Sequence, residues 1–112
     1  MDARESRLAK NEAVFREINE RVNELAASHG TDAHVYAFFC ECSDADCTRQ
    51  LELTRDAYEE VRARGNRFLV ASGHQLPELE TAIERRDEWL VVEKQNEAGK
   101  LARQLDPRNG EG

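Results

Sequence analysis

Residues 34–47 read HVYAFFCECSDADC and contain all three cysteines of the 112-residue chain. The first seven of these residues are rich in aromatic and β-branched types and follow no helical period, so they predict a β-strand. Alternate residues of a strand point to the same side, so Cys40 and Cys42 should share one face while Glu41 points to the other. The C-x-C-x4-C spacing therefore predicts two sulfur atoms side by side at the end of a strand.

A turn should bring the third cysteine back to the first two. The four residues between Cys42 and Cys47 are Ser-Asp-Ala-Asp, and all of them suit a turn. Three thiolates that converge within a few ångström repel one another unless a cation lies between them. Zn²⁺, which binds sulfur at about 2.3 Å, fits that arrangement. We therefore expect Zn²⁺ as the cofactor of this loop.

The chain offers three histidines for the fourth position of a closed zinc site. His34 lies on the same predicted strand as Cys40, about 20 Å away at about 3.3 Å per residue, and His29 is farther still at a helix end. His74 follows a predicted strand, 67–71, and a glycine turn, and it reaches the cysteines if that strand lies beside the first. The predicted ligands are Cys40, Cys42, Cys47 and His74. The alternative is that another group closes the site.

The flanking segments predict a small α+β fold with a mostly antiparallel sheet of about four strands. Further strands are expected at 50–53, 67–71 and 88–93. Three further helices are expected. The first covers 54–64 and is capped by Thr54, the second is short, begins at Pro77 and has Leu79 and Ile83 facing inward, and the third covers 95–105. The whole chain, 1–112, should form one domain. Its parts are a long N-terminal helix at 6–29, a zinc-containing core at 34–105 and a flexible tail at 106–112.

The N-terminal helix carries a row of apolar residues. Phe15, Ile18, Val22 and Leu25 follow one another at steps of three, four and three residues, which predicts a seam that contacts another surface. Glu12 and Arg16 have the spacing of an exposed ion pair on the opposite side. The seam either packs on its own domain or contacts a protein partner. The simplest such partner is a second copy of the chain, related by a two-fold axis.

Composition narrows the possible functions. With 16 basic and 23 acidic residues the net charge is −7, so nucleic acid and anionic membranes should be repelled. No apolar run approaches the ~20 residues of a membrane span. The N-terminus lacks the apolar stretch of a signal peptide, so we expect a soluble, cytoplasmic protein. One helix face is expected to carry the acidic residues Glu78, Glu80, Glu84, Asp87 and Glu88. This face is either solvated or in contact with a basic partner.

Four blocks of sequence carry a resemblance to a known family: NEAVFREINERV, FFCECSDADCTRQLELTRDAYEEVRA, RFLVASGH and WLVVEKQNEAG. They resemble a set of short actinobacterial proteins with a C-x-C-x4-C motif, over residues 7–107. That family has no established activity, so the resemblance implies no function. It does group His74 with the cysteine motif. This chain has Ala-Ser-Gly-His at 71–74 where the family has a Pro-Gly-His turn, and it keeps the Gly73–His74 pair.

Three functions are compatible with these features. The first is a protein–protein interaction module with a structural zinc, because four protein ligands leave no coordination position open for chemistry. The second is a thiol-based redox or metal sensor, although Glu41, Asp44 and Asp46 oppose thiolate formation without a metal. An enzyme that uses a zinc or Cys/His site is the least favoured. The chain lacks both the zinc-deaminase signature and H-E-x-x-H, and no catalytic residue is assigned.

Overall fold

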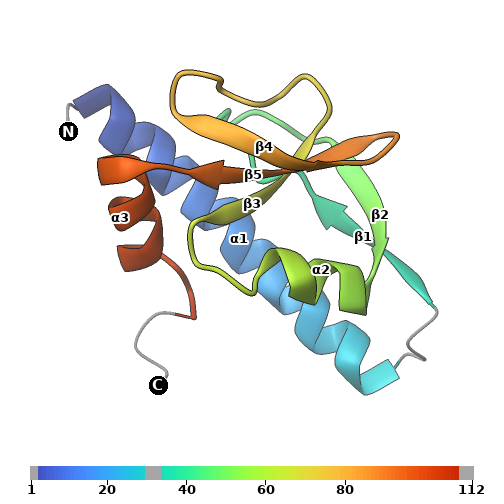
Figure 1. Cartoon of the computed structure of the whole chain (residues 1–112). Helices are drawn as coiled ribbons and strands as arrows, with labels where there is room; N and C mark the ends of the chain where they lie inside the picture. The colour runs from blue at the N-terminus through green and yellow to red at the C-terminus, as the bar shows by residue number, and fades with distance from the viewer. Residues whose placement is uncertain (1–2, 30–33, 109–112) are drawn as a thin grey trace.

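The computed structural model describes residues 3–29 and 34–108. The helices are α1 (Ala3–His29), α2 (Arg55–Val61) and α3 (Asn96–Gln104), and the strands are β1 (Val35–Phe39), β2 (Gln50–Thr54), β3 (Arg67–Ala71), β4 (Glu80–Arg85) and β5 (Trp89–Lys94). The predicted α+β class with a long N-terminal helix is confirmed (Figure 1). Within these ranges no helix is long and apolar enough to cross a membrane.

The strands form two small antiparallel sheets, where about four strands in one sheet were expected. β1 pairs with β2, and the second sheet has the order β3-β5-β4. The two sheets meet where the chain leaves β1, because the backbone N–H of Glu41 donates to the carbonyl of Leu69 in β3 at 2.6 Å. β1 and β3 therefore end close together, as the prediction for His74 required.

The core lies between the sheets and α2. Its fully buried side chains include Phe38, Leu51, Tyr58, Phe68, Leu69, Val70 and Val92. Phe38 and Tyr58 stack with ring centroids 4.4 Å apart. Thr54 caps α2 as predicted, since its hydroxyl accepts a hydrogen bond from the backbone N–H of Ala57 at 3.1 Å. Each fully buried large apolar side chain stabilises the fold by about 1.5–3 kcal/mol.

The helix predicted after Pro77 is wrong, because Glu80–Arg85 forms strand β4. Exposure along β4 alternates residue by residue, and the strand pairs with β5 through a register shift between Ala82 and Glu84. Two β-branched residues, Thr81 and Ile83, favour this conformation. The acidic residues of this segment therefore do not share a solvated helix face.

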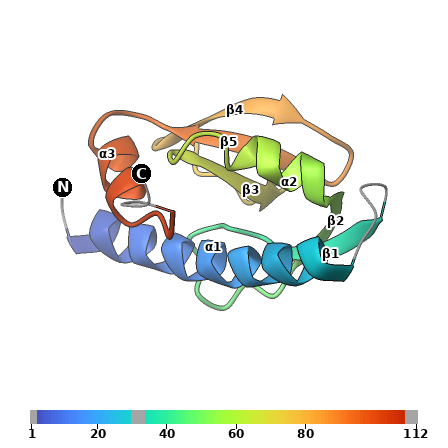
Figure 2. The same ribbon diagram turned by 90° about the horizontal axis from the view of Figure 1, so that it is seen from below.

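Helix α1 crosses one side of the molecule and contacts β1, α2 and α3 (Figures 1 and 2). Its inward face is mainly polar: the buried residues are Glu12, Phe15, Arg16, Asn19, Asn23 and Ala26. Buried polar groups of this kind need hydrogen-bond partners, and each partner fixes a point of contact. The helix is therefore attached mainly through specific polar contacts.

The predicted apolar seam does not form one surface. Phe15 is only 8% exposed and Val22 packs against the core, whereas Ile18 and Leu25 are 39% and 64% exposed. At 3.6 residues per turn, Ile18 and Leu25 point about a quarter turn or less away from Phe15 and Val22. Together with Val14, which is 57% exposed, they form an outer stripe on α1, defined here as Val14, Ile18 and Leu25.

Arg16 joins α1 to the C-terminal part of the chain. Its side chain is 1% exposed and donates hydrogen bonds to the carbonyls of Ala102 at 3.3 Å and Gly65 at 2.9 Å. It also pairs with the Asp106 carboxylate at 3.1 Å and lies 4.3 Å from the ring centroid of Phe68. The end of α3 is therefore held by a buried guanidinium.

The first residues of the predicted flexible tail, 106–112, make contacts with the helices. Arg108 makes ion pairs with Glu20 of α1 at 2.7 Å and with Glu59 of α2 at 3.0 Å. Residues 109–112 lie outside the described residues. Arg108 thus connects the C-terminal segment to both α1 and α2.

A buried ion triad connects α1, β4 and β5. Lys94 Nζ lies 2.7 Å from a carboxylate oxygen of both Glu12 and Glu80, and 5.6 Å from the ring centroid of Phe68. The expected exposed pair of Glu12 with Arg16 is wrong, since both side chains are buried. Burial raises the pKa of Glu12 from 4.5 to about 7, against the attraction of Lys94.

Lys94→Met should destabilise the fold strongly, because it leaves two buried carboxylates without their cation. Removing one partner of a buried ion pair typically costs about 3–5 kcal/mol. The free energy of unfolding, measured by urea denaturation at neutral pH, gives this value. The matched control is Lys100→Met, which breaks an exposed pair with Glu97 and should change stability by less than about 0.5 kcal/mol. Equal effects of the two variants would contradict the triad.

The titration of Glu12 should make stability fall as pH rises. The folded state keeps a proton on Glu12 between pH 4.5 and about 7, where the unfolded chain has lost it, so unfolding releases a proton in that window. The free energy of unfolding should drop by about 3 kcal/mol across it relative to Glu12→Gln, which cannot titrate there. Denaturation curves of both proteins from pH 4 to pH 8 test this. A constant difference between them would refute the assignment.

Candidate metal centre

The cysteine loop begins where β1 ends and keeps the alternation of a strand. Cys40 and Cys42 are buried on one side, and Glu41 is buried on the other, as predicted. A turn follows, in which the Asp46 N–H donates to the Asp44 carboxylate at 2.9 Å and the Cys47 N–H to the Asp44 carbonyl at 3.1 Å. This turn returns Cys47, which is partly exposed, to the first two cysteines.

His74 reaches the cluster from the end of β3. Its backbone N–H donates to the carbonyl of Ala71 at 2.9 Å, which closes a tight turn. Gly73 occupies this turn with φ of +92°, a conformation that side-chain-bearing residues rarely adopt. The sequence Ala-Ser-Gly-His therefore brings the imidazole back over the sheet end.

The four predicted ligands lie together. Their ligand atoms are all within 4.8 Å of one another, and His74 Nδ1 is 3.6 Å from the sulfur atoms of both Cys40 and Cys47. The ring of His34 lies instead beside Tyr36, with ring centroids 4.6 Å apart. The side chain of His29 lies outside the described residues.

These separations suit a tetrahedral zinc ion. Bonds of about 2.3 Å to sulfur and about 2.05 Å to nitrogen place sulfur and nitrogen about 3.6 Å apart, and two sulfurs about 3.8 Å apart. The observed sulfur–nitrogen distances are 3.6 Å, and the widest pair of ligand atoms, at no more than 4.8 Å, lies within about 1 Å of the tetrahedral spacing. Three thiols and one imidazole are also a common donor set of structural zinc sites.

Backbone N–H groups surround the sulfur atoms. The Ala71 N–H donates to Cys40 Sγ at 3.2 Å, and the backbone N–H groups of Asp44 and Arg49 act to lower the pKa of Cys42 and Cys47. Each donor favours the thiolate form of its cysteine. The backbone thus favours the charged form of all three sulfurs, the form that a metal ion would neutralise.

The three thiols differ in acidity. A hydrogen bond from the Cys40 thiol lowers the pKa of Cys42 to about 5, and a bond from His74 acts in the same direction. The same Cys40–Cys42 bond, together with burial, raises the pKa of Cys40, and burial raises that of Cys47. Cys42 is therefore the first thiolate of the cluster, and a metal ion has to displace the protons of the other two.

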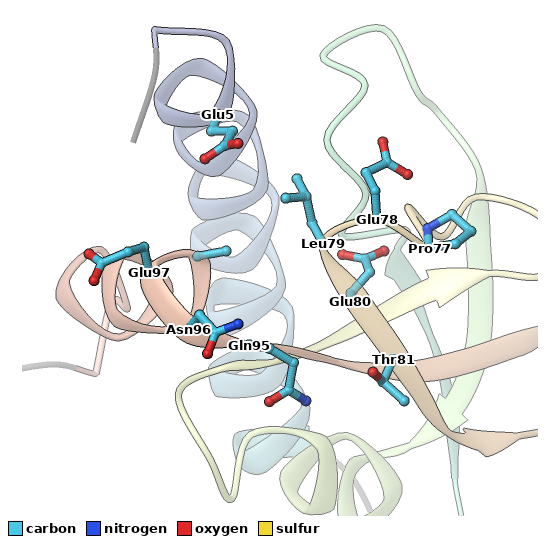
Figure 3. Close-up of a pocket in the computed structure, with 10 residues that line it drawn as sticks. Glu5, Pro77, Glu78, Leu79, Glu80, Thr81, Gln95, Asn96 and Glu97 are labelled. Carbon is cyan, nitrogen blue, oxygen red and sulfur yellow. The ribbon is translucent and has the colours of Figure 1, made fainter.

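The hollows that lie away from the cysteine cluster include the following two. The first, of about 250 Å³, is lined by carboxylates that include Glu5, Glu78, Glu80 and Glu97 (Figure 3), and Glu80 already pairs with Lys94. It is smaller than ligand pockets of about 300–1,000 Å³. The second is an open groove between β2 and the turn that joins β4 to β5. Within residues 3–29 and 34–108, the cysteine–histidine cluster is the one group arranged to hold a metal.

Comparisons with known proteins do not show which family the chain belongs to. No protein-family model, curated protein or solved structure matches the chain. The resemblance to short actinobacterial proteins with a C-x-C-x4-C motif is not tested by these comparisons and stays a prediction. The cysteine–histidine cluster is therefore the feature that bears on function.

Proposed function

We propose that the protein binds one zinc ion through Cys40, Cys42, Cys47 and His74. The observation that supports this most directly is the 3.6 Å separation of His74 Nδ1 from two sulfur atoms, which equals the spacing of a tetrahedral site. The backbone donors on all three sulfurs support it further. No other histidine of the described residues lies near the cluster.

The zinc has a structural role in this proposal. Four protein ligands fill a tetrahedral ion, so no position remains for a reacting water or substrate. The ligands come from the end of β1, the loop after it and the end of β3, so the ion holds the two sheets together. A small domain with 112 residues gains from such a staple because its apolar core is modest.

The domain serves protein–protein interaction, and the outer stripe of α1 supplies the contact. We propose a second copy of the chain as its occupant. The exposed charges beside the stripe are basic in the first half of α1, at Arg7 and Lys10, and mostly acidic in the second half, at Glu17 and Glu24. An antiparallel copy related by a two-fold axis brings opposite charges together along the stripe.

A thiol-based sensor is the alternative function of the same cluster. Its support is the partial exposure of Cys47, the one cysteine that an oxidant or a competing chelator reaches directly. Oxidation of Cys47 would release the ion and free the loop. The structural and sensor functions share the ligand set and differ in how readily the zinc leaves.

Purified protein should contain about one zinc per chain, and His74→Ala should weaken zinc binding far more than His34→Ala. The physical reason is that only the imidazole of His74 completes the tetrahedron. Elemental analysis gives the stoichiometry, and competition with a chromophoric chelator gives the affinities. A well-folded wild type with three freely titrating thiols and no zinc would refute the site.

Leu25→Asp should convert a dimer into a monomer without unfolding it, because this side chain is 64% exposed on the outer stripe. Sedimentation velocity over a range of concentrations measures the change in mass. Glu17→Gln, which alters the flanking charge only, is the matched control and should weaken dimerisation much less. A wild type that sediments as a monomer at the highest concentration would exclude the second copy as partner.

A further inference from the structure

The side of the cysteine strand that faces away from the metal ligands is held by a set of buried polar contacts. Glu41, between Cys40 and Cys42, is fully buried, and its Oε1 accepts a hydrogen bond from the Leu69 N–H at 2.9 Å. Its own N–H donates to the Leu69 carbonyl at 2.6 Å. Glu41 therefore engages both backbone groups of one residue of β3.

Asn19 of α1 holds the same strand from the helix. Its amide nitrogen donates to the Phe39 carbonyl at 2.8 Å, and its amide oxygen accepts from the Phe39 N–H at 2.7 Å. The side chain thus pairs with the outer edge of β1 as a neighbouring strand would. The same nitrogen donates to Glu41 Oε2 at 2.8 Å, so Asn19 fixes two residues that flank Cys40.

Two further contacts complete the arrangement. Tyr58 donates its hydroxyl to Glu41 Oε2 at 2.6 Å, while its ring stacks on Phe38. Asn11, two turns before Asn19 on α1, donates to the Ser43 carbonyl at 2.9 Å. Polar side chains of α1 and α2 therefore hold Phe39, Glu41 and Ser43, the residues that alternate with Cys40 and Cys42. We name the contacts of Asn19, Tyr58 and Asn11 with this strand the loop clamp.

We propose that Glu41 and Asn19 are positioning residues of the metal centre, which set the spacing of the Cys40 and Cys42 sulfurs before the metal arrives. This role rests on the proposed zinc site. Residues 40–49 have no regular secondary structure, so the C-x-C pair lies beyond the β1–β2 ladder except for the Cys40 N–H, which donates to the Arg49 carbonyl at 2.9 Å. Without the loop clamp, zinc binding itself would have to order this segment. The entropy lost on ordering would then weaken zinc binding.

The chemistry of the clamp makes it sensitive to small changes. The Glu41 carboxylate accepts three hydrogen bonds, one at Oε1 and two at Oε2. Glu41→Gln places an amide N–H₂ group opposite either the Asn19 donor or the Leu69 N–H. Asn19→Ala removes both partners of Phe39 together with one partner of Glu41. Neither change alters a predicted ligand.

The test measures zinc affinity in full-length Glu41→Gln, Asn19→Ala and Tyr58→Phe by chelator competition. A parallel titration with Co²⁺ follows the thiolate-to-cobalt absorption band. Every measurement is made at a temperature where Trp89 fluorescence shows the variant to be folded. We expect Glu41→Gln and Asn19→Ala to weaken zinc binding by about 10–100-fold, the range for residues that orient metal ligands. Tyr58→Phe keeps the stacked ring and loses one donor, so a smaller decrease is expected.

The matched control is Asn66→Ala. Asn66 is also a buried asparagine that donates to a backbone carbonyl, that of Lys94 at 3.0 Å, and it is bonded to no residue of the cysteine loop. It should lower stability without changing zinc affinity. The positioning role is overturned if the clamp variants bind zinc as wild type does, or if Asn66→Ala weakens binding as much as they do.

Failure of the zinc site itself has a separate signature. In that case the wild-type protein would bind neither Zn²⁺ nor Co²⁺. The positioning role would then be refuted together with the zinc site. Should Glu41→Gln and Asn19→Ala fail to fold, Tyr58→Phe decides the question: unchanged zinc affinity in this variant would overturn the proposal, and a measurable loss would support it.

Discussion

The structure depends on how the buried polar face of α1 finds its hydrogen-bond partners. An unpaired buried amide or guanidinium costs about 1–3 kcal/mol or more, so each such group has to meet a partner in the fold. Asn19 meets the free edge of β1, and Arg16 meets carbonyls at the end of α3 and before β3. These partners come from segments far apart in the sequence. A 27-residue helix thus acts as the common support of both sheets.

The candidate metal centre follows from the same constraint. A strand has two sides, and the segment after β1 uses one for sulfur ligands and the other for α1 and β3. The cluster of ligand atoms within 4.8 Å and the fully buried Glu41 are two consequences of one backbone conformation. A one-residue shift of this segment would turn Glu41 toward the sulfur side and the cysteines toward α1 and β3. The two sides therefore depend on the same register.

Local signals in the sequence predicted the parts of the fold that local chemistry determines. The C-x-C-x4-C spacing, the cap at Thr54 and the strand 67–71 gave the ligand cluster, α2 and β3. Partners distant in sequence were missed. Nothing near Glu12 indicates that it pairs with Lys94, and nothing near Glu80 indicates that its segment joins β5 as a strand. The sequence predicts Glu12 and Glu80 to be exposed, whereas both are buried beside the ammonium group of Lys94.

The polar inner face of α1 also explains how the proposed zinc site and the outer stripe are connected. A helix that docks through apolar packing stays attached when one contact is lost, since the hydrophobic effect is non-directional. Hydrogen bonds from Asn11 and Asn19 require the cysteine loop in one conformation. We therefore expect the loop, the ion and the middle of α1 to form one cooperative unit. A protein partner bound to Ile18 and Leu25, on the outer stripe beside these contacts, would contact a helix whose attachment depends on the proposed metal.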